Sequence, residues 1–138
     1  MITIRRGKPA DIPAIHAIQA ASTGAAQWDL VQYLEYDLFV AMAAGVVAGF
    51  LVARMLAPGE CEILNLAVSP EWRRRGVARA LVAALLEAFR GDVFLEVRPS
   101  NDAARTLYRS MGFEELLLRP DYYESPLEAA IVMKLRSC

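Results

Sequence analysis

An unbroken apolar run, Leu38–Ala53, places the strongest constraint on how this chain can fold. It reads LFVAMAAGVVAGFLVA, and Gly45 and Gly49 interrupt it. A membrane-spanning helix needs about 20 apolar residues, so the run is too short to cross a bilayer as a helix. Two strands that are buried on both faces and joined by a turn at Ala43–Gly45 account for it better. We therefore expect a buried hairpin here.

The remaining pattern predicts strands and helices in alternation on either side of this hairpin. Gly76–Phe89 is the clearest helix, because its apolar residues recur at a spacing of four. Helices are also predicted from Pro9 and Asp11, over Asp29–Glu35 and over Asn101–Met111. Strands are predicted over Ile2–Arg5, Asp37–Ala43, Val46–Leu56, Cys61–Val68, Asp92–Val97, Phe113–Arg119 and Ala129–Leu135. The expected fold class is therefore α/β (α+β), in a single domain over residues 1–138.

Composition excludes several classes of protein. A formal net charge of −1 over 138 residues argues against a nucleic-acid partner, which would call for a markedly basic domain. Cys61, Cys138 and the single histidine, His16, have no metal-ligand spacing and form no disulfide framework, so we expect no metal. No signal-peptide pattern is seen, and the expectation is a cytoplasmic protein with no membrane partner. No feature specifies an oligomeric state.

The stretch between the predicted strand Cys61–Val68 and the helix that follows it suits an anion. Free N–H groups and the helix dipole make a helix N-terminus a ready anion site. Gly76 and Ala78 lack bulk, so the backbone amides nearby can come close to a pyrophosphate. Arg73–Arg75 add positive charge and bidentate donors, although a solvated basic turn would also explain them. The dinucleotide-binding and P-loop patterns are absent.

The sequence resembles the GNAT superfamily of acetyl-CoA-dependent N-acetyltransferases. Arg73–Ala78, RRRGVA, is similar to the family signature R/Q-x-x-G-x-G/A, with alanine where glycine is common. The segment Leu95–Asn101 resembles the RimI-type subgroup, which acetylates the N-terminal alanine of a ribosomal protein. The resemblance continues at the family's spacing through Ala104, Leu107-Tyr108, Gly112-Phe113, Tyr122-Tyr123 and Ala130–Met133. It implies a mixed, mostly antiparallel, twisted sheet of about seven strands flanked by about four helices.

This resemblance assigns residues to acetyl-CoA, the implied co-substrate. The backbone of the strand before the arginine loop would pair with the pantetheine arm, at Leu66, Ala67 and Val68. The pyrophosphate would lie over Arg74, Arg75, Gly76, Val77, Ala78 and Arg79, with Arg73 nearby.

Asn101 and Tyr108 are predicted to share one face of a helix, with Ala104 between them. Spacing alone favours a structural explanation, a helix-capping asparagine and a packed tyrosine. By resemblance, Asn101 hydrogen-bonds the cofactor arm and Tyr108 is the general acid near the sulfur. A phenol of pKa ~10 need not transfer its proton fully to a thiolate of pKa ~8.5. A hydrogen bond to the developing charge already stabilises it.

An amine nucleophile must lose a proton, so a carboxylate is expected within reach of it. Glu96 matches the glutamate assigned as base in RimI-type enzymes, and we expect it to be the base. Glu62 matches a strand glutamate used by histone-type members and is the alternative. A structural carboxylate paired with an arginine, such as Glu96 with Arg98, would look the same in sequence. Cys61 has no His or Asn partner nearby and is expected to be a core thiol.

The expected activity is transfer of acetyl from acetyl-CoA to a primary amine by direct attack in a ternary complex. A peptide N-terminal α-amine is the expected acceptor. The alternatives are a small amine (a polyamine, amino acid or antibiotic) and a non-catalytic acyl-CoA-binding module. Candidate acceptor contacts are the aromatic residues Trp28, Tyr33, Tyr36 and Tyr122-Tyr123, for which packing is an equally good explanation.

Overall fold

Within the described residues, four α-helices and seven strands follow one another in the predicted order. The computed structural model describes residues 1–22, 30–124 and 127–137. The strands are β1 (Ile2–Arg6), β2 (Asp37–Ala43), β3 (Val46–Ala57), β4 (Glu60–Val68), β5 (Gly91–Val97), β6 (Glu114–Glu124) and β7 (Leu127–Ser137). The helices are α1 (Ile12–Ala20), α2 (Leu30–Tyr33), α3 (Val77–Ala88) and α4 (Asp102–Ser110), with 3₁₀ turns η1 (Pro9–Asp11) and η2 (Pro70–Trp72).

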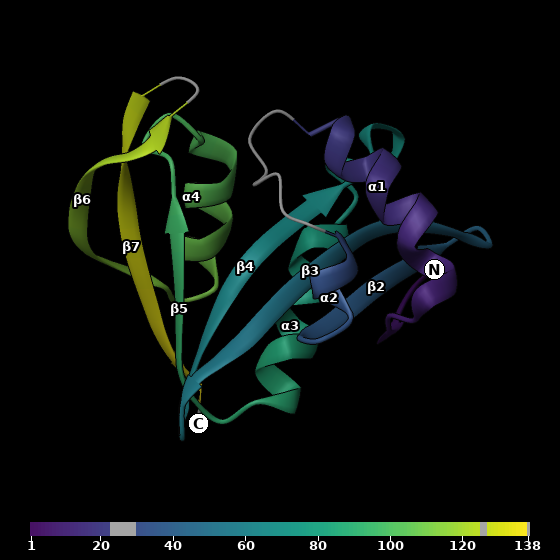
Figure 1. Ribbon diagram of the computed structural model, residues 1–138, viewed down its shortest axis with the longest axis horizontal. Coiled ribbons are helices and arrows are strands. Elements are labelled where there is room, and N and C mark those ends of the chain that lie inside the picture. The colour runs from purple at the N-terminus through teal and green to yellow at the C-terminus, as the bar shows by residue number, and fades with distance from the viewer. Residues whose placement is uncertain (23–29, 125–126, 138) are drawn as a thin grey trace. The chain divides into compact units, whose positions relative to one another are not determined.

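The strands form a seven-stranded sheet in the order β1-β2-β3-β4-β5-β7-β6 (Figure 1). β1 with β2, β2 with β3, β5 with β7 and β6 with β7 pair antiparallel, whereas β4 and β5 run parallel. A parallel pair needs a long crossover connection, and α3 supplies it between β4 and β5. This mixed, mostly antiparallel sheet confirms the expected fold class.

β6 continues further than the sequence predicts. The predicted strand ends at Arg119, and the next residue, Pro120, lacks the N–H that a central strand needs. β6 is an edge strand, so the backbone on one of its sides has no neighbouring strand with which to pair. A residue without an N–H can occupy that side without breaking a hydrogen bond of the sheet. The register also shifts between Arg119 and Tyr123, and a proline is tolerated at such an irregularity.

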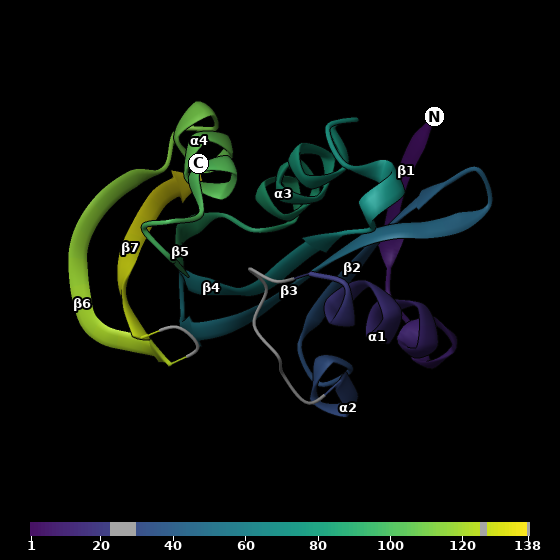
Figure 2. The same cartoon turned by 90° about the horizontal axis from the view of Figure 1, so that it is seen from above.

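The chain divides into two compact units, of which the first comprises Met1–Arg54 and Leu64–Phe89. In this unit α1 and α2 cover one face of the strands and α3 covers the other (Figure 2). Consecutive hairpin residues such as Phe50, Leu51 and Val52 are therefore all buried. This confirms that the apolar run forms a hairpin buried on both faces. No helix of the described ranges is long and apolar enough to span a membrane.

The second unit comprises Met55–Ile63 and Arg90–Cys138. Its strands alternate cleanly between two faces, because successive side chains of a strand point in opposite directions. One face is apolar, with Ile63, Val93, Leu95 and Met133 buried. Phe94 and Glu96 point to the opposite face by this alternation. The expectation of a single domain over residues 1–138 stays a prediction.

Gly91 begins β5 in a conformation that only glycine adopts easily. Its φ is +136°, and an added Cβ would collide with the carbonyl oxygen of Gly59. That same oxygen accepts a hydrogen bond of 2.9 Å from the backbone N–H of Asp92. Gly91→Ala is expected to lower the free energy of unfolding by roughly 2–4 kcal/mol in urea titrations. Gly59→Ala (φ +77°, with no atom near the added Cβ) is the matched control and should cost only about 1 kcal/mol.

Candidate active site

The loop between β4 and α3 carries the arginines that the sequence predicts to bind a pyrophosphate. Arg73 Nε donates to the Val68 carbonyl oxygen at 3.2 Å, which ties the loop to the end of β4. The guanidinium of Arg75 lies over the Trp72 ring, 5.3 Å from its centroid. Arg74 is exposed and has a φ of +62°, which is unusual for a residue with a side chain. Such strained residues concentrate at ligand clamps.

Gly76 provides the N-cap of α3 with a φ of +83°. No heavy atom lies within 4 Å of the position that a Cβ would take there. The backbone at the start of α3 is thus open to a ligand, and its first N–H groups need partners. These features fit a phosphate group at the positions that the sequence predicts.

Gly49 of β3 permits a close approach of the backbone that was not predicted from the sequence. A Cβ at Gly49 would lie 2.9 Å from the Ala67 carbonyl oxygen and 3.0 Å from Cγ1 of Val77. β3 therefore packs directly against the end of β4 and the first turn of α3, both of which carry predicted cofactor contacts. The sequence signal was a glycine inside an apolar strand, which often marks such an approach.

A buried polar cluster of Gln19, Tyr33 and Asn65 fixes the middle of β4. Tyr33 Oη donates to Gln19 Oε1 at 2.6 Å, and Asn65 Nδ2 donates to Tyr33 Oη at 3.0 Å. Asn65 Oδ1 accepts from the N–H of Leu66, the first predicted pantetheine contact, at 3.0 Å. Burial raises the pKa of Tyr33, and the hydrogen bond from Asn65 partly offsets this. Tyr33 is fully buried, so for this aromatic residue the packing explanation holds.

In the second unit, Glu96 is a largely buried carboxylate whose two oxygens differ in their hydrogen bonding. Only 12% of its side chain is exposed, and Oε1 accepts from Arg119 Nη1 at 2.8 Å. Oε2 is buried and has no hydrogen-bond partner among the described residues. Burial raises the pKa of Glu96, Arg119 lowers it, and the nearby charge of Glu62 raises it. The arginine that pairs with Glu96 is Arg119 of β6, whereas Arg98 was the example that the sequence offered for such a pair.

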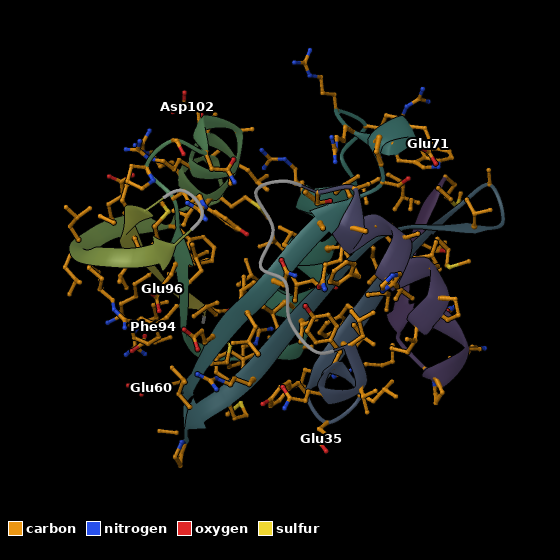
Figure 3. All side chains as sticks on the ribbon, turned by 45° about the horizontal axis from the view of Figure 1, so that its top comes forward. Glu35, Glu60, Glu71, Phe94, Glu96 and Asp102 are labelled. Atoms are coloured by element: carbon orange, nitrogen blue, oxygen red, sulfur yellow. The ribbon has the colours of Figure 1, made fainter. Side chains whose placement is uncertain are left out.

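Both candidate bases point to the same face of the sheet. Glu62 of β4 is opposite Phe94 of β5, and Glu96 follows Phe94 by two residues. Figure 3 labels Phe94 and Glu96 along β5. The structure thus brings Glu62 and Glu96 together, and their roles as bases stay predictions.

α4 holds the other two predicted residues. Asn101 is its N-cap, and Asn101 Oδ1 accepts from the N–H of Ala104 at 3.2 Å. Tyr108 is buried, with its ring edge-on to Phe113 at 5.4 Å between centroids. The capping asparagine and the packed tyrosine are therefore both present. Their predicted roles toward acetyl-CoA stay predictions.

The remaining residues that the sequence singled out are not among the candidate acetyl-CoA contacts or bases. His16 is exposed on α1, and Cys61 is a buried cysteine. Trp28 and the side chains of Tyr122 and Tyr123 lie outside what the structure describes.

Comparison with known proteins identifies the class. Residues 13–113 match the model of the acetyltransferase (GNAT) family. The ribosomal protein bS18-alanine N-acetyltransferase of Escherichia coli K12 is 37% identical over 110 residues, which are 75% of this chain and 72% of that protein. The N-alpha-acetyltransferase RimI of Mycobacterium tuberculosis is 41% identical over 87 residues, 60% of this chain and 55% of that one. An uncharacterised Mycobacterium leprae protein is 39% identical over 115 residues, 80% of this chain but only 32% of that protein.

Solved structures agree with this assignment. The ribosomal-protein-S18-alanine N-acetyltransferase of E. coli superposes with a TM-score of 0.85 at 31% identity, covering 99% of this chain and 94% of that one. Ard1 of Thermoplasma volcanium gives a TM-score of 0.88 at 31% identity, covering 99% of this chain and 98% of that one. The chain therefore belongs to the acetyltransferase (GNAT) family. It is an N-acetyltransferase that uses acetyl-CoA as its co-substrate, which confirms the resemblance seen in the sequence.

Proposed function

We propose that this enzyme acetylates the α-amine at the N-terminus of a protein or peptide. The relatives support this acceptor, because two of them are named as N-terminal or ribosomal-protein alanine acetyltransferases. The structural observation that carries the chemistry is the buried carboxylate of Glu96, which has one oxygen left without a partner among the described residues.

The roles follow from what the side chains can do. Bound acetyl-CoA supplies an acetyl group that is activated as a thioester. Arg74, Arg75 and the N–H groups that follow Gly76 would hold its pyrophosphate, and the backbone of Leu66, Ala67 and Val68 its pantetheine arm. An α-amine of pKa ~8 is largely protonated at neutral pH and needs a base. Glu96 would take that proton on Oε2.

Tyr108 would act at the other end of the reaction. Its hydroxyl would donate a hydrogen bond to the sulfur that leaves as the amide forms, and this bond stabilises the developing charge with or without full proton transfer. Asn101 would hold the cofactor arm nearby through its amide.

A thiol-release assay tests the acceptor directly. Peptides that begin with alanine and other residues are compared with polyamines, amino acids and aminoglycosides, and with the same peptides blocked at the N-terminus. We expect turnover on free N-termini and none on blocked ones. Faster turnover on a small amine would replace the proposed acceptor. Binding of acetyl-CoA without turnover on any amine would favour a non-catalytic module.

Tyr108→Phe is expected to lower kcat by about 10–100-fold, because it removes the hydrogen bond to the leaving sulfur. The phenyl ring keeps its edge-on contact with Phe113, so the melting temperature should change little. Phe113→Leu is the control: it disturbs the same packing but keeps the hydroxyl, and should lower the melting temperature more than kcat. An unchanged kcat in Tyr108→Phe would remove Tyr108 from the mechanism.

A further inference from the structure

The ion pair between Arg119 and Glu96 is asymmetric. Arg119 Nη1 donates a hydrogen bond of 2.8 Å to Oε1, and no described residue donates a hydrogen bond to Oε2. An arginine can bond both oxygens of a carboxylate through its planar fork, and such bidentate pairs are common. Here Oε2 is left buried and without a partner in the described part of the chain. A buried acceptor without a hydrogen bond costs stability, so its presence calls for an explanation.

The register of the sheet shows how Arg119 reaches Glu96 across the strand between them. Arg119 is opposite Ala130 of β7, and Glu96 is opposite Val132 of the same strand. Positions 130 and 132 are two apart, so Arg119 and Glu96 belong to the same face. Ala130, the residue opposite Arg119, has a small side chain.

A register shift in β6 puts Arg119 on that face. Glu114 and Glu115 are opposite Lys134 and Met133, but Leu117 is opposite Val132, so one residue of β6 is inserted between them. Without the insertion Arg119 would be opposite residue 129 and would point to the other face. Bulges re-aim side chains in this way and are frequent beside active sites.

Other charged residues lie on the same face of the sheet as Glu96. Glu62 faces Glu96 from β4, and its negative charge raises the pKa of Glu96. On β5, Arg98 follows Glu96 by two residues, and Asp92 precedes it by four. On β7, Lys134 Nζ lies 3.5 Å from Asp92 Oδ2, and Arg136 Nε lies 3.3 Å from Asp92 Oδ1. Arg119 is therefore the cation whose hydrogen bond reaches Glu96 directly.

We infer that Arg119 is a positioning residue that bonds Oε1 of Glu96 and so presents Oε2 to the proton of the acceptor amine. The inference rests on the proposed function, in which Glu96 is the base. The N–H⁺ bond of the amine breaks, the proton passes to Oε2, and the freed electron pair attacks the acetyl carbon. The bond from that carbon to sulfur then breaks, and coenzyme A leaves as the thiolate that Tyr108 hydrogen-bonds. Arg119 keeps its own proton throughout. Its charge offsets the burial of the carboxylate and keeps Oε2 available as an acceptor.

The test replaces Arg119 with glutamine and with lysine. In Arg119→Gln the positive charge that lowers the pKa of Glu96 is lost. The fall of kcat on the acidic side of its pH profile (the acid limb) should therefore move to higher pH by about one unit. kcat at saturating peptide is the right readout, since kcat/KM also carries the ionisation of the amine near pH ~8. Arg119→Lys keeps the charge and should restore most of the shift. Arg109→Gln is the matched control, because Arg109 of α4 forms an equally short pair of 2.8 Å with Glu115 of β6.

A second measurement needs no acceptor. The carboxyl carbon of Glu96 is titrated by ¹³C NMR in the substrate-free enzyme, with Glu96→Gln identifying the signal. A higher midpoint in Arg119→Gln, with no change in Arg109→Gln, supports the inference even if no peptide is acetylated, in which case only the proposed acceptor fails. An unchanged Glu96 midpoint in Arg119→Gln overturns the inference. A raised midpoint also overturns it if the variant acetylates a substrate and the acidic side of its kcat–pH profile is the same as in the wild type.

Discussion

Replacing Glu96 with glutamine is expected to lower kcat by about 10²–10⁴-fold, the usual contribution of a general base. Glutamine keeps the size of the side chain but cannot accept the proton. In the wild-type enzyme kcat should fall on acidification through a pKa that burial has raised above that of an ordinary glutamate. The variant should lose this limb. The measurement is kcat against pH for both enzymes with the best peptide of the acceptor panel.

The same substitution should leave folding intact. Because the pKa of Glu96 is raised in the folded state, this group favours folding while protonated, and that contribution is lost as pH rises through the folded-state pKa. At neutral pH, glutamine removes a buried charge whose partner, Arg119, is 52% exposed and remains solvated. The urea midpoint of Glu96→Gln should therefore be no lower than that of the wild type. A large loss of both kcat and stability would point to a structural role instead.

Glu62→Gln is the matched control, because Glu62 lies on the same face and is the alternative base. Removing its charge should lower the pKa of Glu96 and shift the acid limb of kcat to lower pH. kcat at neutral pH should remain within a few fold of the wild type. If Glu62→Gln carries the large loss and Glu96→Gln does not, the base is Glu62.

Local patterns in the sequence predicted most of the fold. The doubly buried hairpin followed from the length of the apolar run, since only strands covered on both faces bury every residue. The four-residue apolar spacing after Gly76 predicted α3, whose leucines Leu81 and Leu85 are buried. These features depend on residues close together in the chain. That is why they can be read without knowing which strands pair.

What the sequence could not provide depends on the register between distant strands. Arg98 was one arginine that could pair with Glu96, yet the observed partner is Arg119. That pairing requires the inserted residue of β6, and no local pattern in the sequence predicts this insertion. Gln19 was visible as a polar residue on the apolar side of α1. Its partners Tyr33 and Asn65 come from other elements, and only the packed structure joins them.

Gly76→Ala is expected to weaken acetyl-CoA binding by at least about tenfold. Alanine at a φ of +83° is strained by about 1–2 kcal/mol, and its methyl group would occupy the space through which a pyrophosphate approaches the N–H groups of α3. Isothermal titration calorimetry measures the Kd, and kcat at saturating acetyl-CoA should be close to that of the wild type. The proton-transfer residues belong to the other unit, so only the cofactor affinity should respond.

Gly45→Ala separates the strain from the loss of binding. Gly45 forms the turn between β2 and β3 with a φ of +78°, and no heavy atom lies within 4 Å of its added Cβ either. The two glycines thus share their backbone conformation and their open surroundings, and the two alanine variants should lose similar stability. Only Gly76→Ala should change the Kd. Equal changes in Kd would mean that strain alone is being measured, and an unchanged Kd in Gly76→Ala would remove the start of α3 from the cofactor site.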